Sequence, residues 1–145
     1  MKEETTSRLE KIMKTLKDES HAEGFSSEHA LPSRAFNEYI NDYIAEKDII
    51  VSEMVQRSGI SKNYVYNILN GITKSPGRDK IIAICIAAGM TLDELNRGLQ
   101  LSGNNKLYPK NKRDIYIATC VNQGLTDVTK INLELEKSGI EIINV

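Results

Sequence analysis

The sequence predicts an all-α fold, and two observations carry that prediction. Apolar residues recur at intervals of three and four along most of the chain, and glycine, proline or short polar stretches break the pattern at short intervals. Of the 145 residues, 40% are apolar, 27% are charged and three are prolines, as in ordinary helical domains. We expect an N-terminal amphipathic helix with a flexible linker over 1–33, a helical domain over 34–102 and a C-terminal helical hairpin over 103–145.

The first part carries a single apolar stripe. Its members, at helical spacing, are Leu9, Ile12, Met13 and Leu16. Residues 21–33, "HAEGFSSEHALPS", indicate a linker, and Ser33 is a candidate N-cap for the helix that follows. The stripe could dock on the body of the protein, mediate dimerisation or bind another protein, so a protein partner through this helix is an open expectation.

Five short helices are expected over 34–102, because local signals for helix ends divide the apolar pattern. In order, these signals are Gly59 after 51–58, Ser61 before the third helix, Asn70-Gly71 after it, Pro76-Gly77 before 77–88, and Thr91 with Glu94 as a capping box before 91–101. Helices this short are marginal alone, so packing must stabilise them.

The C-terminal part echoes the end of this domain. "RDKIIAICIAAGMT" (78–91) and "RDIYIATCVNQGLT" (113–126) share seven of fourteen residues at an offset of 35. We interpret this as a repeated helical hairpin, with helices at about 112–123 and 126–138. The final residues, "IEIINV", suit a short strand or an extended tail.

Several classes of protein are disfavoured. No apolar run approaches the roughly 20 residues of a membrane helix, and the start lacks the apolar region of a secretory signal. Cys85 and Cys120 lie in apolar patterns and are expected to be small core residues rather than a disulfide or a metal pair. With no nucleophile elbow, phosphate-binding glycine loop or paired carboxylates, we expect no enzyme, cofactor or metal site.

Positive charge concentrates in one stretch of this nearly neutral chain. The formal net charge is −1, but residues 60–80 hold Lys62, Lys74, Arg78 and Lys80 against Asp79, giving +3. Strongly basic patches are typical of nucleic-acid-binding surfaces, whereas a neutral total argues mildly against one.

The same stretch has the pattern of two helices joined by a tight turn. In "VSEMVQRSGISKNYVYNILNG" (51–71), Met54 and Val55 are expected to face inward, Gly59 to permit the turn and Ile60 to fill the space beneath it. Val65 and Ile68 anchor the second helix from behind. The residues left outside are Lys62, Asn63, Tyr66 and Asn67. Asn can pair with adenine, and Lys can donate to guanine, so this face could read bases or be an ordinary polar helix surface.

Residues 34–102 resemble the lambda-repressor-like, or XRE-type, helix-turn-helix family of bacterial and phage transcriptional regulators. The resemblance rests on "SGIS" at the turn, "ILNG" at the end of the third helix and "GMTLDEL" before the fifth. It implies a cytoplasmic protein that binds double-stranded DNA sequence-specifically, commonly as a homodimer, with no membrane partner. The nucleic-acid-binding residues it implies, together with the pattern above, are Ser52, Lys62, Asn63, Tyr64, Tyr66, Asn67, Lys74 and Arg78.

Three alternatives stay open. Arg78-Asp79 recurs as Arg113-Asp114, which equally suits a structural ion pair or a helix-start device. A second basic cluster, Lys106, Lys110, Lys112 and Arg113, could contact phosphates or be plain loop polarity. The protein could also be an interaction adaptor that keeps the fold without specific DNA binding. The neutral charge, the C-terminal extension and Val51, at a position where the family often has glutamine, favour that reading.

Overall fold

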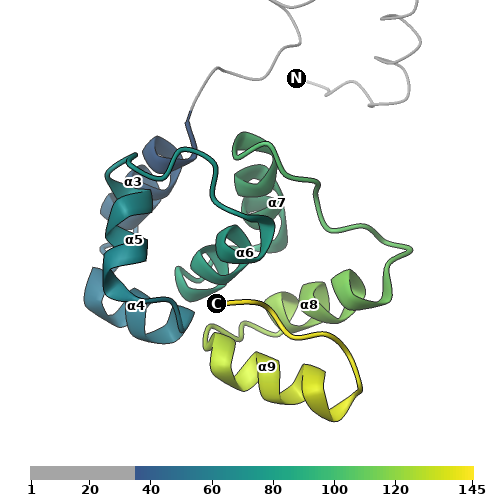
Figure 1. Cartoon of the computed structure of the whole chain (residues 1–145). Helices are drawn as coiled ribbons and strands as arrows, with labels where there is room; N and C mark the ends of the chain where they lie inside the picture. Colours follow the sequence, from purple (N-terminus) through teal and green to yellow (C-terminus); the bar gives the residue numbers. More distant parts are fainter. Residues whose placement is uncertain (1–34) are drawn as a thin grey trace, which may run out of the picture. The chain divides into compact units, whose positions relative to one another are not determined.

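A computed structural model of the chain describes residues 35–145, and the N-terminal amphipathic helix and linker fall outside that part. Within the described residues the chain forms seven helices and no strand (Figure 1). They are α3 (Phe36–Glu46), α4 (Val51–Ser58), α5 (Lys62–Leu69), α6 (Arg78–Ala87), α7 (Leu92–Leu101), α8 (Lys112–Asn122) and α9 (Val128–Lys137). The all-α prediction is confirmed.

The local signals for helix ends act as expected at three boundaries. Gly59 ends α4 with φ 71°, in the left-handed region where a residue without a Cβ is favoured. The Ser61 hydroxyl accepts a hydrogen bond from the Tyr64 amide at 3.3 Å at the start of α5. Thr91 and Glu94 form the predicted capping box before α7. The helix predicted after Ser33 is present as α3, but Ser33 is not its N-cap: that position is Ala35, which makes no side-chain cap.

Helix α6 is the centre of the core. Every residue from Ile81 to Ala87 is buried, because α4 and α7 pack against α6 and the C-terminal hairpin adds α9. Helix α3 lies across α5 and α7. Cys85 and Cys120 are both buried free thiols, as predicted. Burial raises the pKa of each thiol above its usual value, as expected for inert core cysteines.

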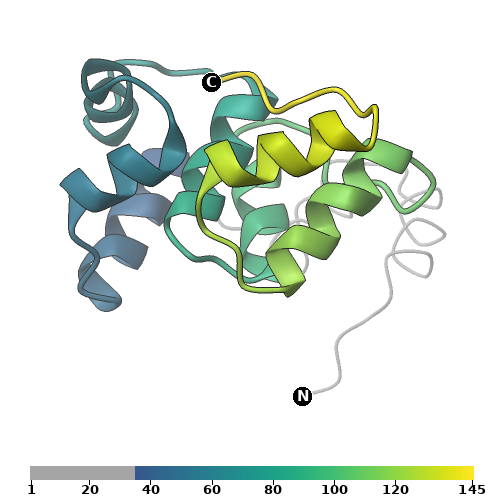
Figure 2. The same cartoon turned by 90° about the horizontal axis from the view of Figure 1, so that it is seen from below.

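The two hairpins, α6–α7 and α8–α9, meet through a reciprocal arrangement. Arg78 at the start of α6 pairs with Asp114 in α8, and Arg113 at the start of α8 pairs with Asp79 in α6. The repeat identified in the sequence is therefore a pair of hairpins related by an approximate two-fold axis. Figures 1 and 2 show α8 and α9 side by side, with α3, α4 and α5 lying on the other side of α6.

The last residues form an extended tail rather than a strand. The tail runs from the end of α9 back toward α4 and α6 (Figure 2). Ile143 is fully buried, and its amide and carbonyl bond to the side chain of Asn132 at 2.8 and 3.0 Å. The Val145 side chain reaches Gly59, where an added Cβ would lie 3.2 Å from Val145 Cγ2. The tail thus packs behind the turn that joins α4 to α5.

Candidate nucleic-acid interface

Three residues, 59–61, join α4 to α5 and set the angle between the two helices. Gly59 takes the left-handed conformation, and Ile60 is buried beneath the turn. Ser58 is fully buried; its hydroxyl donates to the Val55 carbonyl at 2.7 Å and accepts from the Ile60 amide at 3.1 Å. Because both hydrogen-bonding functions of Ser58 are used, a polar residue is accommodated at the end of α4.

The inner sides of α4 and α5 are held by apolar burial and by two bonds from other helices. Met54 and Val65 are fully buried and Ile68 almost so, as the sequence predicts. Arg57 Nε donates to the Ala87 carbonyl at 2.9 Å, which joins α4 to α6. Asn41 Nδ2 donates to the Leu69 carbonyl at 2.7 Å, which joins α3 to the end of α5. The helix pair is therefore a fixed platform for its outer surface.

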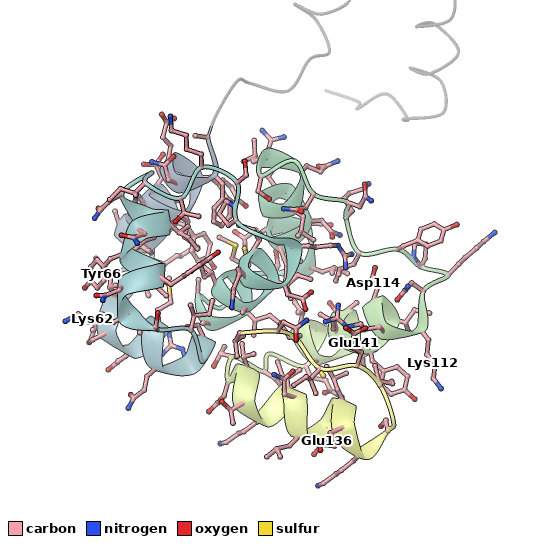
Figure 3. All side chains as sticks on the ribbon, viewed as in Figure 1. Lys62, Tyr66, Lys112, Asp114, Glu136 and Glu141 are labelled. Carbon is pink, nitrogen blue, oxygen red and sulfur yellow. The ribbon has the colours of Figure 1, made fainter. Side chains whose placement is uncertain are left out.

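The outer face of α5 consists of the four predicted side chains. Lys62, Asn63, Tyr66 and Asn67 are all exposed. Lys62 and Tyr66 both extend from α5 away from the other labelled residues (Figure 3), and the Lys62 ammonium lies 5.9 Å from the centre of the Tyr66 ring. The Ser61 side chain accepts a hydrogen bond from only one amide at the start of α5, so this end of the helix keeps the partial positive charge of the helix dipole. Lys62 lies at the same end and adds its own positive charge.

Two of the remaining predicted residues are exposed at positions outside α5. Ser52 is exposed in the first turn of α4, and Lys74 is exposed in the loop between α5 and α6. Tyr64 is half-buried against the core, and the ammonium of Lys80 lies 5.3 Å from the centre of its ring. Lys80 was not among the predicted site residues. Its membership of the +3 cluster was the only signal, because its position over Tyr64 depends on how α5 and α6 pack.

Arg78 has a structural role in the fold. Its guanidinium donates to both carboxylate oxygens of Asp114, at 3.1 and 2.8 Å, and to the carbonyls of Asn105 and Lys106 at 3.0 and 3.2 Å. Of the two interpretations left open, this geometry supports the structural ion pair. We therefore do not count Arg78 among the candidate DNA contacts.

The second basic cluster lies away from α5. Arg113 is used by Asp79 and by the carbonyls of Glu141 and Ile142. Lys112 projects at the opposite side of the molecule from Lys62 (Figure 3). Loop polarity is the simpler account of this cluster.

Val51, named above in favour of the adaptor alternative, has a structural role that it shares with Val55. Val51 and Val55 are both partly buried and pack on the core, so apolar residues there complete the packing of α4.

Among residues 35–145, no helix has the length and apolar character needed to cross a bilayer. No group of three or more His, Cys, Asp or Glu side chains is arranged to hold a metal ion in that range.

A short helix, a three-residue turn and a second helix with an exposed polar face define a helix-turn-helix protein. Residues 40–98, from α3 to α7, match the family model of the Cro/C1-type HTH DNA-binding domain. The match supports DNA binding by this part of the chain, and the predicted resemblance to lambda-repressor-like regulators is confirmed. The family is typically non-enzymatic. Neither a curated protein nor a solved structure matches the chain significantly.

Proposed function

We propose that this protein is a sequence-specific transcriptional regulator that inserts α5 into the major groove of double-stranded DNA. It has no catalytic role in this proposal and acts in the cytoplasm, where its DNA would lie. One observation carries the proposal: the apolar side of α5 is fixed in the core, while its outer face presents Lys62, Asn63, Tyr66 and Asn67.

The charge around α5 supports contact with phosphates. Asp79 is the only acidic residue among residues 60–80, and Arg113 neutralises it. Lys62, Lys74 and Lys80 form no ion pair within the described part of the chain, so their charges are available to phosphates. A positive strip beside the helix favours DNA over the adaptor, whose surface would be mixed or acidic.

The side chains of the face divide by the contacts that they can make. Asn63 and Asn67 each offer an amide that can bond adenine at N6 and N7, and Lys62 can donate to guanine. Tyr66 can reach a phosphate or a thymine methyl group. Ser52, Tyr64, Lys74 and Lys80, at the flanks, suit backbone contacts that set the register of α5. The proposal therefore assigns specificity to the centre of the face and affinity to its rim.

Fluorescence anisotropy on duplexes selected from a random pool, at low and near-physiological salt, tests this assignment. Asn63→Ala and Asn67→Ala should each weaken binding to the selected duplex by about 1–3 kcal/mol and relax its sequence preference. Asn105→Ala, an exposed asparagine in the loop between α7 and α8, is the matched control and should change neither. Binding that disappears at physiological salt and ignores both α5 variants would instead favour the adaptor.

A further inference from the structure

We infer that the outer face of the α8–α9 hairpin is a dimerisation surface, occupied by a second copy of this chain. This face lies outside the residues that match the Cro/C1-type family, so the inference goes beyond the proposed DNA contact. The two hairpins differ at their outer surfaces, because equivalent positions of the repeat are buried in the first hairpin and exposed in the second.

Some equivalent positions of the two hairpins are buried alike. With the offset of 35 in the first helix, Ile82 corresponds to Ile117, and both are fully buried. With the offset of 36 in the second helix, Leu99 corresponds to Leu135, and both are buried to at least 99%. The equivalence established from the sequence therefore holds in the packing.

At the outer surface, equivalent positions of the two hairpins differ in exposure. Ile81, Ile84 and Met90 of the first hairpin are buried, and their counterparts in the second hairpin are Tyr116, Thr119 and Leu125. Thr119 is exposed, Tyr116 is 40% exposed and Leu125 is 39% exposed. The second hairpin thus leaves bare a face that the first hairpin covers.

The structure also shows what covers the first hairpin. Helix α4 packs on α6, and α3 packs on α7. Phe36 of α3 lies so close to Gly98 that an added Cβ would be 3.1 Å from both the Phe36 ring and Cys85 Sγ. The Tyr39 hydroxyl donates to the Glu94 carbonyl at 2.9 Å. The outer surface of the first hairpin therefore packs against an apolar helix face.

On α8–α9 the equivalent outer surface is an open groove of about 660 Å³. Its apolar lining includes Ile115, Tyr116, Leu125 and Leu133. Leu133 is 53% exposed on α9. Isolated apolar residues on a surface are ordinary, whereas four that line one groove offer a partner a single apolar contact area.

A second copy fits this face for two reasons. Because Leu133 is exposed beside the groove, a two-fold axis can place the Leu133 of each protomer into the groove of the other. The lining also holds both signs of charge, with Glu134 beside Lys130 and Lys137, so a two-fold can oppose Lys to Glu. The groove offers what an isologous contact needs on each partner.

The surface is also extended beyond this groove. A second groove, lined by Tyr108 and Pro109 among others, shares Ile115 and Thr119 with the first. Together the two grooves are lined by twenty residues, of which Cys120, Leu135 and Asp114 are buried and seventeen are accessible to a partner. Stable interfaces use about 20–30 residues per partner, so the combined surface comes close to the lower end of that range.

This arrangement has a consequence that rests on the proposed function. A dimer through α8–α9 leaves α5 free on each protomer, because Lys62 and Tyr66 of α5 project on the opposite side of the described domain from the hairpin (Figure 3). Two copies of α5 would then read two half-sites related by a two-fold axis.

Sedimentation velocity of the full chain without DNA tests the inference. Across about 1–100 μM, where micromolar self-association is visible, the mass should rise to twice 16.3 kDa. Leu133→Lys introduces a charge at the centre of the contact and should weaken the dimer at least about tenfold. Ile50→Lys replaces an equally exposed apolar residue outside the grooves and should leave the dimer unchanged. Circular dichroism confirms that each variant is folded.

Either of two results overturns the inference. One is a chain that stays monomeric at every concentration, including the case in which another segment of the same chain fills the groove. The other is a dimer that Leu133→Lys does not weaken. The measurement uses no DNA, so a monomer that still binds its duplex overturns the dimer and leaves the proposed function intact.

Discussion

Arg78 of the first hairpin donates to both carboxylate oxygens of Asp114 in the second, at 3.1 and 2.8 Å. In the same way, Arg113 of the second hairpin donates to both carboxylate oxygens of Asp79 in the first, at 3.1 and 2.7 Å. Each guanidinium also donates to two carbonyls of the extended segment that follows its own hairpin. Each aspartate accepts an amide from the other hairpin's extended segment, Tyr108 to Asp114 and Asn144 to Asp79. The paired residues thus join four segments at once and hold the C-terminal hairpin on the Cro/C1-type domain.

The Arg78–Asp114 pair should be strongly coupled in stability. Asp114 is nearly buried, so Arg78→Met leaves its carboxylate without a cation and should cost about 3 kcal/mol of unfolding free energy. Because Arg78→Met/Asp114→Met removes both charges, it should cost less than the sum of the single changes, with a coupling of at least about 1 kcal/mol. Urea unfolding of the four proteins completes the cycle. Additive losses would contradict a paired role.

Asp79 should make stability depend on acid pH. Burial raises its pKa, but hydrogen bonds from Arg113 and Asn144 and the charge of Arg113 outweigh burial, and the net pKa is lowered. The unfolded carboxyl titrates near about 4, so Asp79 stabilises the fold above that pH and loses this contribution as pH falls through its lower folded pKa. Unfolding free energy measured across this window should fall less steeply in Asp79→Asn. An unchanged slope would contradict the assignment.

Gly98 should tolerate a methyl group poorly. An alanine Cβ there would lie 3.1 Å from Cys85 Sγ and from the Phe36 ring, and both neighbours belong to the packed core. Gly98→Ala should cost about 1–3 kcal/mol through overpacking, despite the better helix propensity of alanine. Gly77→Ala is the control, because Gly77 has φ −64° and open space around its Cβ position. Equal melting temperatures for the two variants would refute close α3–α7 packing at Gly98.

The salt dependence of DNA binding should count the cations at the interface. If Lys62, Lys74 and Lys80 each meet a phosphate, log K should fall with log salt at a slope of about −3. Lys80→Gln should reduce the magnitude of that slope by about 1, while Lys112→Gln on α8 should leave it unchanged. A slope altered by Lys112→Gln would move the interface toward the C-terminal hairpin.

The sequence determined the end of α4, the starts of α5 and α7 and the character of the α5 surface, because all of these depend on neighbouring residues. A cap such as Ser61 bonds an amide three residues away, and a left-handed turn at Gly59 needs only the missing Cβ. Burial by helical spacing likewise predicted Val65 and Ile68 inside and Asn63 outside.

Only the tertiary structure decided which distant groups meet. The repeated Arg-Asp pair was visible in the sequence. The local pattern is the same whether each arginine pairs with the aspartate of its own copy or with that of the other copy. Arg78 meets Asp114 across 36 positions because two hairpins pack about an approximate two-fold axis. The same packing decided that Ile81 is buried while its counterpart Tyr116 is exposed, since α4 packs on α6, whereas the helices packed on α8 are α7 and α9. Burial of an apolar face depends on what is folded against it, and spacing along one chain does not contain that information.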